Sequence, residues 1–259
     1  MEKGMLKPNE IVKATINAGI NKAKLSSLQM ILLGILAGIF IGFGAHANIA
    51  ISQTLGRFDI GVATFMGAAV FPVGLMLVLI AGAELFTGNN LMTLALMDRK
   101  ITFSQLSKNW SLVYIGNFIG SILLAYIISE SGLYESNSDI ANRAIGISEA
   151  RVGFTFQAAL LRGILCNIIV VLAVWLSSAS QNVIGKLFSI WFPIMLFVVS
   201  GFEHSVANMF FLSMGKFLGA NITWSEIWIN NLIPVTLGNI IGGAIIIPGI
   251  YYLIYVYKK

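Results

Sequence analysis

Two short segments of this chain repeat one pattern of polar residues inside apolar sequence. They are Gly82-Ala-Glu84-Leu-Phe-Thr-Gly-Asn89 and Gly201-Phe-Glu203-His-Ser-Val-Ala-Asn208, and both follow the spacing G-x-E-x-x-x-x-N. Each copy places one carboxylate in the middle of a long apolar run. A charge at membrane depth is costly and therefore indicates a functional site. Two such charges at corresponding places in two halves of a chain are typical of a transport site at a repeat interface.

The second copy also carries a histidine, His204, directly after its glutamate. Histidine changes charge near physiological pH. Desolvation in an apolar pore favours the neutral ring, whereas an arriving anion favours the protonated ring. This residue could therefore move an anion and a proton together, or let the anion cross as its neutral acid, and Thr87 of the first copy is its expected partner. The alternative is a buried, hydrogen-bonded histidine without a transport role.

Glycines accompany both carboxylates, and glycine is expected where helical backbone unwinds. They are Gly82 and Gly88 in the first copy and Gly201 in the second. Unwound backbone leaves N–H groups that need acceptors in a dry environment. We therefore expect Glu84 and Glu203 to accept these N–H groups and to support two helix breaks. A cation site on the same carboxylates is the alternative, although one charge per break offers few ligands for a hard cation.

Large apolar side chains near the two copies could narrow a pore around the histidine. Hydrophobic narrowings exclude hydrated ions by dewetting, although each such residue could instead contact lipid or pack in a core. The candidates are Phe71, Leu75, Leu85, Phe86 and Phe197.

Other polar side chains in the apolar runs have several possible roles. The amides could cap broken helices, bridge helices or touch substrate; they are Asn89, Asn167, Asn208 and Asn239. Arg151, at the expected outer end of the fourth apolar run, could concentrate anions or anchor the membrane edge. Arg162 lies deeper in that run and is expected to pair with a carboxylate or with carbonyls at a subunit contact. The other histidine, His46, is expected to be structural.

Composition indicates a protein embedded in a membrane. Hydrophobic residues make up 57% and charged residues 10% of the chain, against about 25% charged residues in a typical soluble domain. About 20 apolar residues suffice to cross the hydrocarbon core. The second apolar run is too long for one straight helix, so a break near Glu84 is expected. The six predicted spans are Leu25–Gly56, Gly61–Met97, Trp110–Ser129, Val152–Gly185, Leu187–Gly215 and Ile227–Tyr257.

The repeat extends beyond the two polar segments. Gly116-Asn117-Phe-Ile-Gly120 in the third span corresponds to Gly238-Asn239-Ile-Ile-Gly242 in the sixth. Three spans per copy force the second copy to cross the membrane in the opposite direction, which predicts an inverted repeat with broken second and fifth helices. We expect one all-α domain over residues 28–257, with repeats over 28–131 and 150–257.

Basic residues predict the orientation of the chain. Lysine and arginine gather in the leading segment 1–27, between the second and third spans, and at the C-terminus, and they include Lys3, Lys258 and Lys259. The positive-inside rule therefore places both termini in the cytoplasm of a multi-pass cell-membrane protein. Within the leading segment, residues 8–25 are expected to form an amphipathic helix at the headgroups. Because topology and anionic lipid explain the net charge of +5, nucleic acid is not an expected partner.

Histidine and cysteine are too few for a common metal or haem centre. The chain has two separated histidines and the single Cys166, which together offer no familiar ligand set. No nucleophile–base pair is evident either. We therefore expect no cofactor, no metal and no enzymatic activity, and an integral membrane enzyme is the alternative from another class.

The repeated segments, together with Gly238-Asn-Ile-Ile-Gly-Gly243, resemble the formate/nitrite transporter family over nearly the whole chain. The resemblance implies an aquaporin-like six-span fold, a homopentamer with one pore per protomer, and pH-dependent gating linked to the N-terminal helix. It also implies a central selectivity position at Thr87 and His204. It matches Phe71, Leu75, Leu85, Phe86 and Phe197 to constriction residues, Asn167 and Asn208 to pore-lining amides, and Arg151 to a position that is often lysine.

Together these features predict a channel or transporter for small monovalent anions and protons in the lipid bilayer, with formate first and nitrite, hydrosulfide or other short monocarboxylates also possible. A neutral-solute pore of the water or glycerol type is the alternative within transport. Against that alternative, the chain has no Asn-Pro-Ala pair at its two expected breaks.

Overall fold

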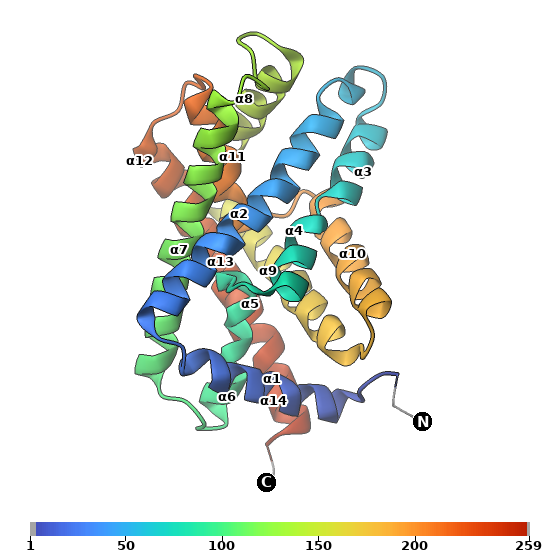
Figure 1. Ribbon diagram of the computed structural model, residues 1–259, viewed down its shortest axis with the longest axis vertical. Coiled ribbons are helices and arrows are strands. Elements are labelled where there is room, and N and C mark those ends of the chain that lie inside the picture. The colour runs from blue at the N-terminus through green and yellow to red at the C-terminus, as the bar shows by residue number, and fades with distance from the viewer. Residues whose placement is uncertain (1–3, 258–259) are drawn as a thin grey trace.

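The computed structural model describes residues 4–257, and in this range the chain is built from helices and the turns that join them. Residues 1–3 and 258–259, which include Lys3, Lys258 and Lys259, lie outside the described residues. Figure 1 shows a bundle of steeply inclined helices in which the first and last described helices lie at the same end.

Three long helices cross the bundle without interruption: α2 (Ser27–Ser52), α7 (Phe103–Glu130) and α9 (Phe156–Ala179). Each begins at a hydroxyl side chain that accepts a backbone N–H of the first turn, as Ser26 does from Gln29. Such caps satisfy donors that have no partner inside the helix. The 26 residues of α2 reach about 39 Å, which exceeds a hydrocarbon core of about 30 Å.

Two other crossings are interrupted, as the sequence predicted. In the first, helix ends at Gly82, residues 83–85 are extended, and helix resumes at Phe86. In the second, helix ends at Val199 and resumes at Ser205. Gly82 and Gly201 have φ angles of 93° and 68°, values that side chains disfavour. The elements are α3 (Ile60–Val70), α4 (Val73–Met76), η2 (Leu77–Gly82), α5 (Phe86–Asn89), η3 (Asn90–Met92) and α6 (Thr93–Met97), then α10 (Val183–Val199) and α11 (Ser205–Phe217).

The last crossing runs continuously from Trp224 to Tyr255 and alternates regular and wider helical turns. Its elements are α12 (Trp224–Glu226), η4 (Ile227–Leu232), α13 (Ile233–Ile240), η5 (Ile241–Ile246) and α14 (Ile247–Tyr255). Within the described residues, five helical stretches are long and apolar enough to cross a membrane, and α10 is a shorter apolar helix.

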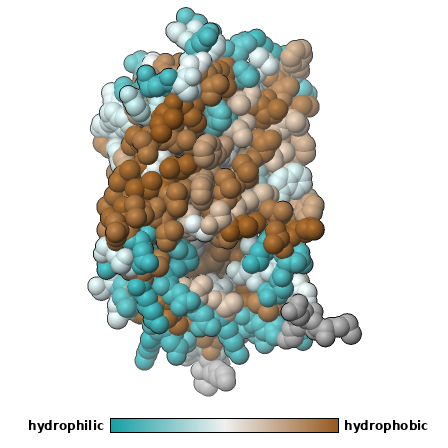
Figure 2. Space-filling view, in the orientation of Figure 1, coloured by the Kyte–Doolittle hydropathy of each residue, from teal (hydrophilic) through white to brown (hydrophobic). Residues whose placement is uncertain are grey.

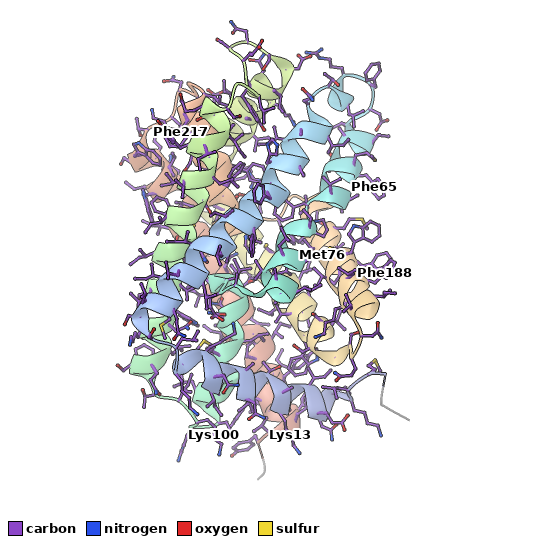
Figure 3. The ribbon with its side chains drawn as sticks, in the orientation of Figure 1. Lys13, Phe65, Met76, Lys100, Phe188 and Phe217 are labelled. Carbon is purple, nitrogen blue, oxygen red and sulfur yellow. The ribbon has the colours of Figure 1, made fainter. Side chains whose placement is uncertain are left out.

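The surface has the layered character of a membrane protein. On the face seen in Figure 2, a broad apolar belt crosses the middle of the molecule and hydrophilic residues gather toward both ends. Phe65 and Phe188 project outward from this belt, whereas Lys13 and Lys100 lie at the end that holds α1 (Figure 3). Several apolar helices with exposed apolar side chains indicate a multi-pass membrane protein.

Three helical segments lie outside the crossings. The predicted N-terminal helix is present as α1 (Pro8–Ala23), with Pro8 at its first turn. Its apolar residues Ile11, Val12 and Ile16 pack against protein, including Leu91 and Leu94. The other two, η1 (Leu55–Arg57) and α8 (Asp139–Val152), were not predicted, and α8 lies at the end of the molecule opposite α1 (Figure 1).

Glycines allow α2 and α7 to pack at backbone contact. A Cβ added at Gly120 would meet the backbone oxygen of Ile35 at 2.0 Å. The equivalent contact between α13–η5 and α9 is formed by Gly238 and Gly242, whose added Cβ atoms would both meet α9 backbone oxygens at 2.2 Å. Small residues at membrane helix interfaces permit such close approach.

We expect Gly120→Ala to destabilise the protein, because only movement of α2 away from α7 can relieve the added contact. Overpacking of this kind costs about 1–3 kcal/mol, so thermal unfolding of the purified protein in detergent should begin several degrees lower. Gly249→Ala in α14 is the matched control, since nothing lies within 4 Å of its added Cβ. Equal unfolding temperatures for the two variants would contradict the proposed packing.

Candidate functional site

The two helix breaks meet in the middle of the molecule. Thr87 lies in the first turn after one break, and His204 is the last residue of the other. Thr87 Oγ1 lies 2.8 Å from His204 Nε2, and both residues are buried. The pairing that the sequence suggested is therefore present as a direct hydrogen bond.

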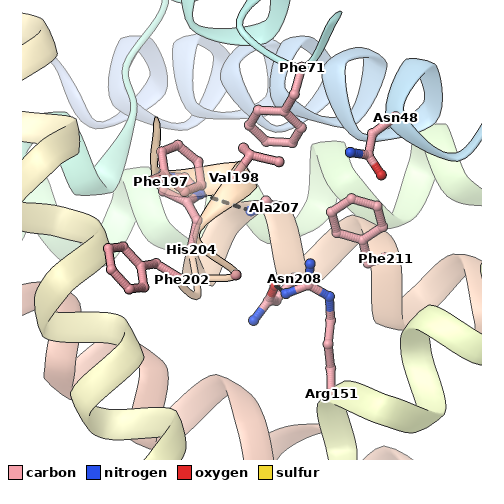
Figure 4. Close-up of a pocket in the computed structure, with 11 residues that line it drawn as sticks. Asn48, Phe71, Arg151, Phe197, Val198, Phe202, His204, Ala207, Asn208 and Phe211 are labelled. Carbon is pink, nitrogen blue, oxygen red and sulfur yellow. Dashed lines mark hydrogen bonds between the residues drawn. The ribbon is translucent and has the colours of Figure 1, made fainter. Parts of the chain in front are cut away.

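The backbone of α11 fixes the protonation pattern of His204. The N–H of Ala207 donates to His204 Nδ1 at 3.0 Å (Figure 4). An acceptor nitrogen carries no proton, so the remaining proton of the neutral ring is on Nε2. Nε2–H then donates to Thr87 Oγ1, which leaves the Thr87 hydroxyl proton free to donate to another group.

Two helix N-termini converge on this pair. One helical stretch begins at Phe86 and continues through α5, η3 and α6, and the other is α11, which begins at Ser205. The N-terminus of a helix carries partial positive charge and unpaired N–H groups. This arrangement favours an anion near the pair.

Two asparagines on neighbouring helices hold the breaks in place. Asn117 Oδ1 accepts the N–H of Phe86 at 2.9 Å, and Asn117 Nδ2 donates to the carbonyls of Gly34 and Glu84. At the other break, Asn239 accepts the N–H of Ser205 at 2.9 Å. Asn239 also donates to two carbonyls, those of Gly163 and Glu203. One amide thus serves the backbone before and after each break.

The expectation that the two glutamates accept the backbone N–H groups is wrong. In the described chain, neither carboxylate accepts a backbone N–H. Glu84 pairs with Lys22 Nζ at 2.6 Å, and Glu203 pairs with Arg151 Nη1 at 2.5 Å. A buried carboxylate is stabilised far more by a cation than by a neutral donor, and an amide can serve both donors and acceptors of the backbone.

Each ion pair belongs to a matching set of side chains. Asn89 donates to Glu84 and to Asn109, while Asn109 donates to the carbonyl of Lys22. In the second set, Asn208 donates to Glu203 and to Asn231, while Asn231 donates to the carbonyl of Arg151. Sequence analysis missed Asn109 and Asn231, although each stands eight positions before Asn117 or Asn239, so an N-x7-N repeat was available as a signal.

Three of the cavities follow one another, and His204 lines two of them. The α8-side vestibule contacts Arg151 and Asn208 and shares Phe71, Phe197 and His204 with a central cavity. The central cavity shares Leu75 and Leu85 with an α1-side vestibule that also contacts Lys22. Phe71 and Phe197 meet edge to face, with ring centroids 5.7 Å apart. Apolar side chains therefore separate the central cavity from the vestibule on each side.

A family model described as "Formate/nitrite transporter" matches residues 9–253 of this chain. The chain belongs to the formate/nitrite transporter family. It is 39% identical to the formate channel BtFdhC of Bacillus thuringiensis and 35% identical to the formate channel FocA of Escherichia coli K12. These alignments cover 96% and 97% of this chain and 95% of each relative. A solved structure called a pentameric formate channel with formate bound has a TM-score of 0.78 at 34% identity, covering 89% of this chain and 98% of that one.

Of the residues matched to the pore of this family, Thr87, Phe86 and Asn167 line none of the three cavities. Phe86 packs edge-on against Trp110 and Tyr114. Asn167 donates to the carbonyls of Thr87 and Asn239 and to Asn90 Oδ1, so it bridges helices near the breaks. For Phe86, the direction of the side chain cannot be predicted from sequence, because the extended residues 83–85 rotate the helical turn that follows them by an unknown angle.

Other family-matched positions also take specific places. Arg151 was expected at an open outer mouth, but its charge is paired with Glu203 beside the α8-side vestibule. Asn208 contacts the same vestibule. Gly88 lies inside α5 and not in the unwound backbone, and it contacts the α1-side vestibule.

The remaining candidates have structural surroundings. Arg162 donates to the carbonyl of Gly201 in the same chain at 3.3 Å and lies over the Phe154 ring, and its pairing at a subunit contact stays a prediction. His46 lies 2.9 Å from the hydroxyl of Tyr134. Burial raises the pKa of Tyr134, which keeps that hydroxyl protonated. Asn48, which sequence analysis did not select, contacts the α8-side vestibule. It belongs to no repeated segment, so the repeat offered no reason to select it.

We expect Asn117→Ala to lower stability sharply, because it leaves three buried backbone groups at Gly34, Glu84 and Phe86 without their partner. Each unsatisfied group costs about 1–3 kcal/mol. Thermal unfolding in detergent and the yield of folded protein measure this loss. Asn142→Ala is the matched control, since Asn142 is exposed on α8 and bonds only the carbonyl of Asn137. Similar stability of the two variants would show that Asn117 does not hold the break.

Proposed function

We propose that this protein is a channel for small monovalent anions, with formate as the first substrate and nitrite, hydrosulfide and other short monocarboxylates as further ones. The observation that carries this proposal is the buried Thr87–His204 hydrogen bond between two apolar boundaries. Two N–H-bearing helix ends and a free hydroxyl proton suit a small anion. The cavities on either side leave room for entry and exit.

The proposed path runs through the three cavities in order. An anion enters the vestibule beside Arg151, passes Phe71 and Phe197, and reaches the central cavity at His204, the hydrogen-bond partner of Thr87. It then passes Leu75 and Leu85 into the vestibule that contacts Lys22. Apolar boundaries exclude a hydrated ion, so the substrate exchanges water for the donors of the central pair.

We further propose that a proton accompanies the anion. An unpaired anion in an apolar cavity is costly, and the neutral acid avoids that cost. Thr87 donates its hydroxyl proton to the anion, takes the Nε2 proton of His204, and Nδ1 of His204 gains a proton from the α8-side vestibule. The ring stays neutral overall, while the Ala207 N–H loses its acceptor for that step. The ring tautomer that leaves the Ala207 N–H without an acceptor is therefore short-lived.

The same proposal includes the architecture. Residues 28–257 form one six-span domain of two inverted repeats, in which α10 and α11 together make the fifth span. The matched sets around Glu84 and Glu203 support this symmetry. We also propose an aquaporin-like homopentamer with one path per protomer, on the pentameric state named for the similar formate channel. The lysine distribution supports a cell-membrane protein with both termini in the cytoplasm.

Proteoliposomes that contain the purified protein should release or take up formate, nitrite and hydrosulfide much faster than protein-free liposomes. Chloride should be slower, because it cannot be neutralised by a proton at working pH. Glycerol-driven changes in vesicle volume measure the rival activity of a neutral-solute pore. Rapid glycerol movement without anion flux would overturn the proposal.

His204→Asn should retain the fold and lose the pH dependence of formate flux. The Asn side chain can still accept the Ala207 N–H, because asparagine is a good helix N-cap, but it does not titrate. In the native protein formate flux should rise as the external pH falls from 8 toward 5, because the relay takes its proton from the α8-side vestibule and that supply grows with the proton concentration. His46→Asn is the matched control, since His46 lies beside Tyr134 and away from the cavities. An unchanged pH profile in His204→Asn would end the proton-relay proposal.

A further inference from the structure

Arg151 presents one edge of its guanidinium group without a partner. Its Nη1 donates to Glu203 Oε1 at 2.5 Å and to Asn208 Oδ1 at 2.7 Å. Its Nε is buried and has no hydrogen-bond partner, and Nη2 makes no hydrogen bond to the described residues. Nε and Nη2 lie on the same edge of the planar group, so two parallel N–H donors remain free.

The position of this edge is fixed before any ligand arrives. The Arg151 guanidinium lies over the face of Phe211, with its central carbon 4.7 Å from the ring centroid. The two bonds of Nη1 hold one side of the group. Asn231 donates to the Arg151 carbonyl at 3.0 Å and holds the backbone. A donor pair that is already oriented binds its ligand at a smaller entropic cost.

The unpaired edge belongs to a residue of the α8-side vestibule. The cavity is also lined by Phe71, Phe197 and Phe202, and by Asn48, whose side-chain amide makes no hydrogen bond to the described residues (Figure 4). The close-up shows Arg151, Asn208 and Phe211 on one side and Asn48 and Phe71 above them. Apolar walls with a few free polar groups are typical of a small-ligand site.

The charge of Arg151 is already balanced by Glu203 at 2.5 Å. Long-range attraction of an anion into this vestibule is therefore weak, because a close ion pair acts as a dipole at a distance. The affinity of this vestibule for an anion therefore depends on the two free N–H donors, which bind only in a defined direction. A lysine ammonium would not supply such a pair, since its three donors surround one point charge and two of them would be used by Glu203 and Asn208.

We propose that the Nε–Nη2 edge of Arg151 is a capture site for planar anions that offer two oxygens, namely carboxylates and nitrite. Both oxygens accept parallel N–H donors in the bidentate geometry that guanidinium and carboxylate share. Chloride and hydrosulfide have a single accepting atom and gain less from this edge. The site thus discriminates by shape at entry, before the central Thr87–His204 pair. This inference rests on the proposed function only for the order of the two sites.

Arg151→Lys tests the site because it keeps the charge and removes the paired donors. Initial flux into proteoliposomes should be measured against concentration for formate, nitrite, hydrosulfide and chloride. We expect the half-saturating concentrations of formate and nitrite to rise about tenfold, the factor expected from one lost charge-assisted hydrogen bond. Those of hydrosulfide and chloride should change less than twofold. Arg143→Lys, on the same helix but bonded to Ser52, should leave all four unchanged.

Phe211→Leu provides a second variant that retains Arg151 and its charge. It removes the ring that holds the guanidinium plane, so the preference for the two-oxygen anions should fall in the same direction. If Arg151→Lys does not fold, this variant alone decides the question. An equal shift for all four anions in the variant that folds, or no shift, would overturn the capture site while native formate flux persists. A native protein that conducts none of the anions would instead overturn the proposed function.

Discussion

The structure depends on satisfying backbone polar groups where two helices unwind inside an apolar environment. Each unpaired N–H or carbonyl at that depth would cost free energy that a marginally stable fold cannot spare. Asn117 and Asn239 meet this constraint with the same set of bonds, one accepted from the resuming helix and two donated to carbonyls. Because the breaks are held from neighbouring helices, the residues within them are free to face a cavity.

The two buried carboxylates serve a different purpose from the amides. Glu84 draws Lys22 of α1 toward one break, and Glu203 draws Arg151 of α8 toward the other. Removing one partner of such a pair would leave an uncompensated buried charge, at about 3–5 kcal/mol. Helices that do not cross the bundle are thereby tied to its centre from opposite ends (Figure 1). Each vestibule consequently has a cation in its wall whose charge is already paired.

The two halves share their supports and differ at the centre. One break contributes Thr87 and the other His204, and only together do they make the 2.8 Å hydrogen bond. The Ala207 N–H defines the donor of that bond, because it occupies the ring nitrogen that would otherwise compete. Matching supports thus hold the two breaks between apolar side chains. The direction of donation along the hydrogen bonds from Ala207 to His204 and from His204 to Thr87 is set by the residues in which the two breaks differ.

The sequence by itself determined the membrane class, the breaks near Glu84 and Glu203, the N-terminal helix and the family, because hydropathy, glycine and local motifs are properties of neighbouring residues. It also pointed to Thr87 and His204 through the repeat. Only the tertiary structure decided that asparagines support the breaks, that Lys22 and Arg151 neutralise the glutamates, and that Phe86 turns toward Trp110. These outcomes depend on which side chains of distant helices meet and on how extended residues rotate the next turn. No local pattern carries that information.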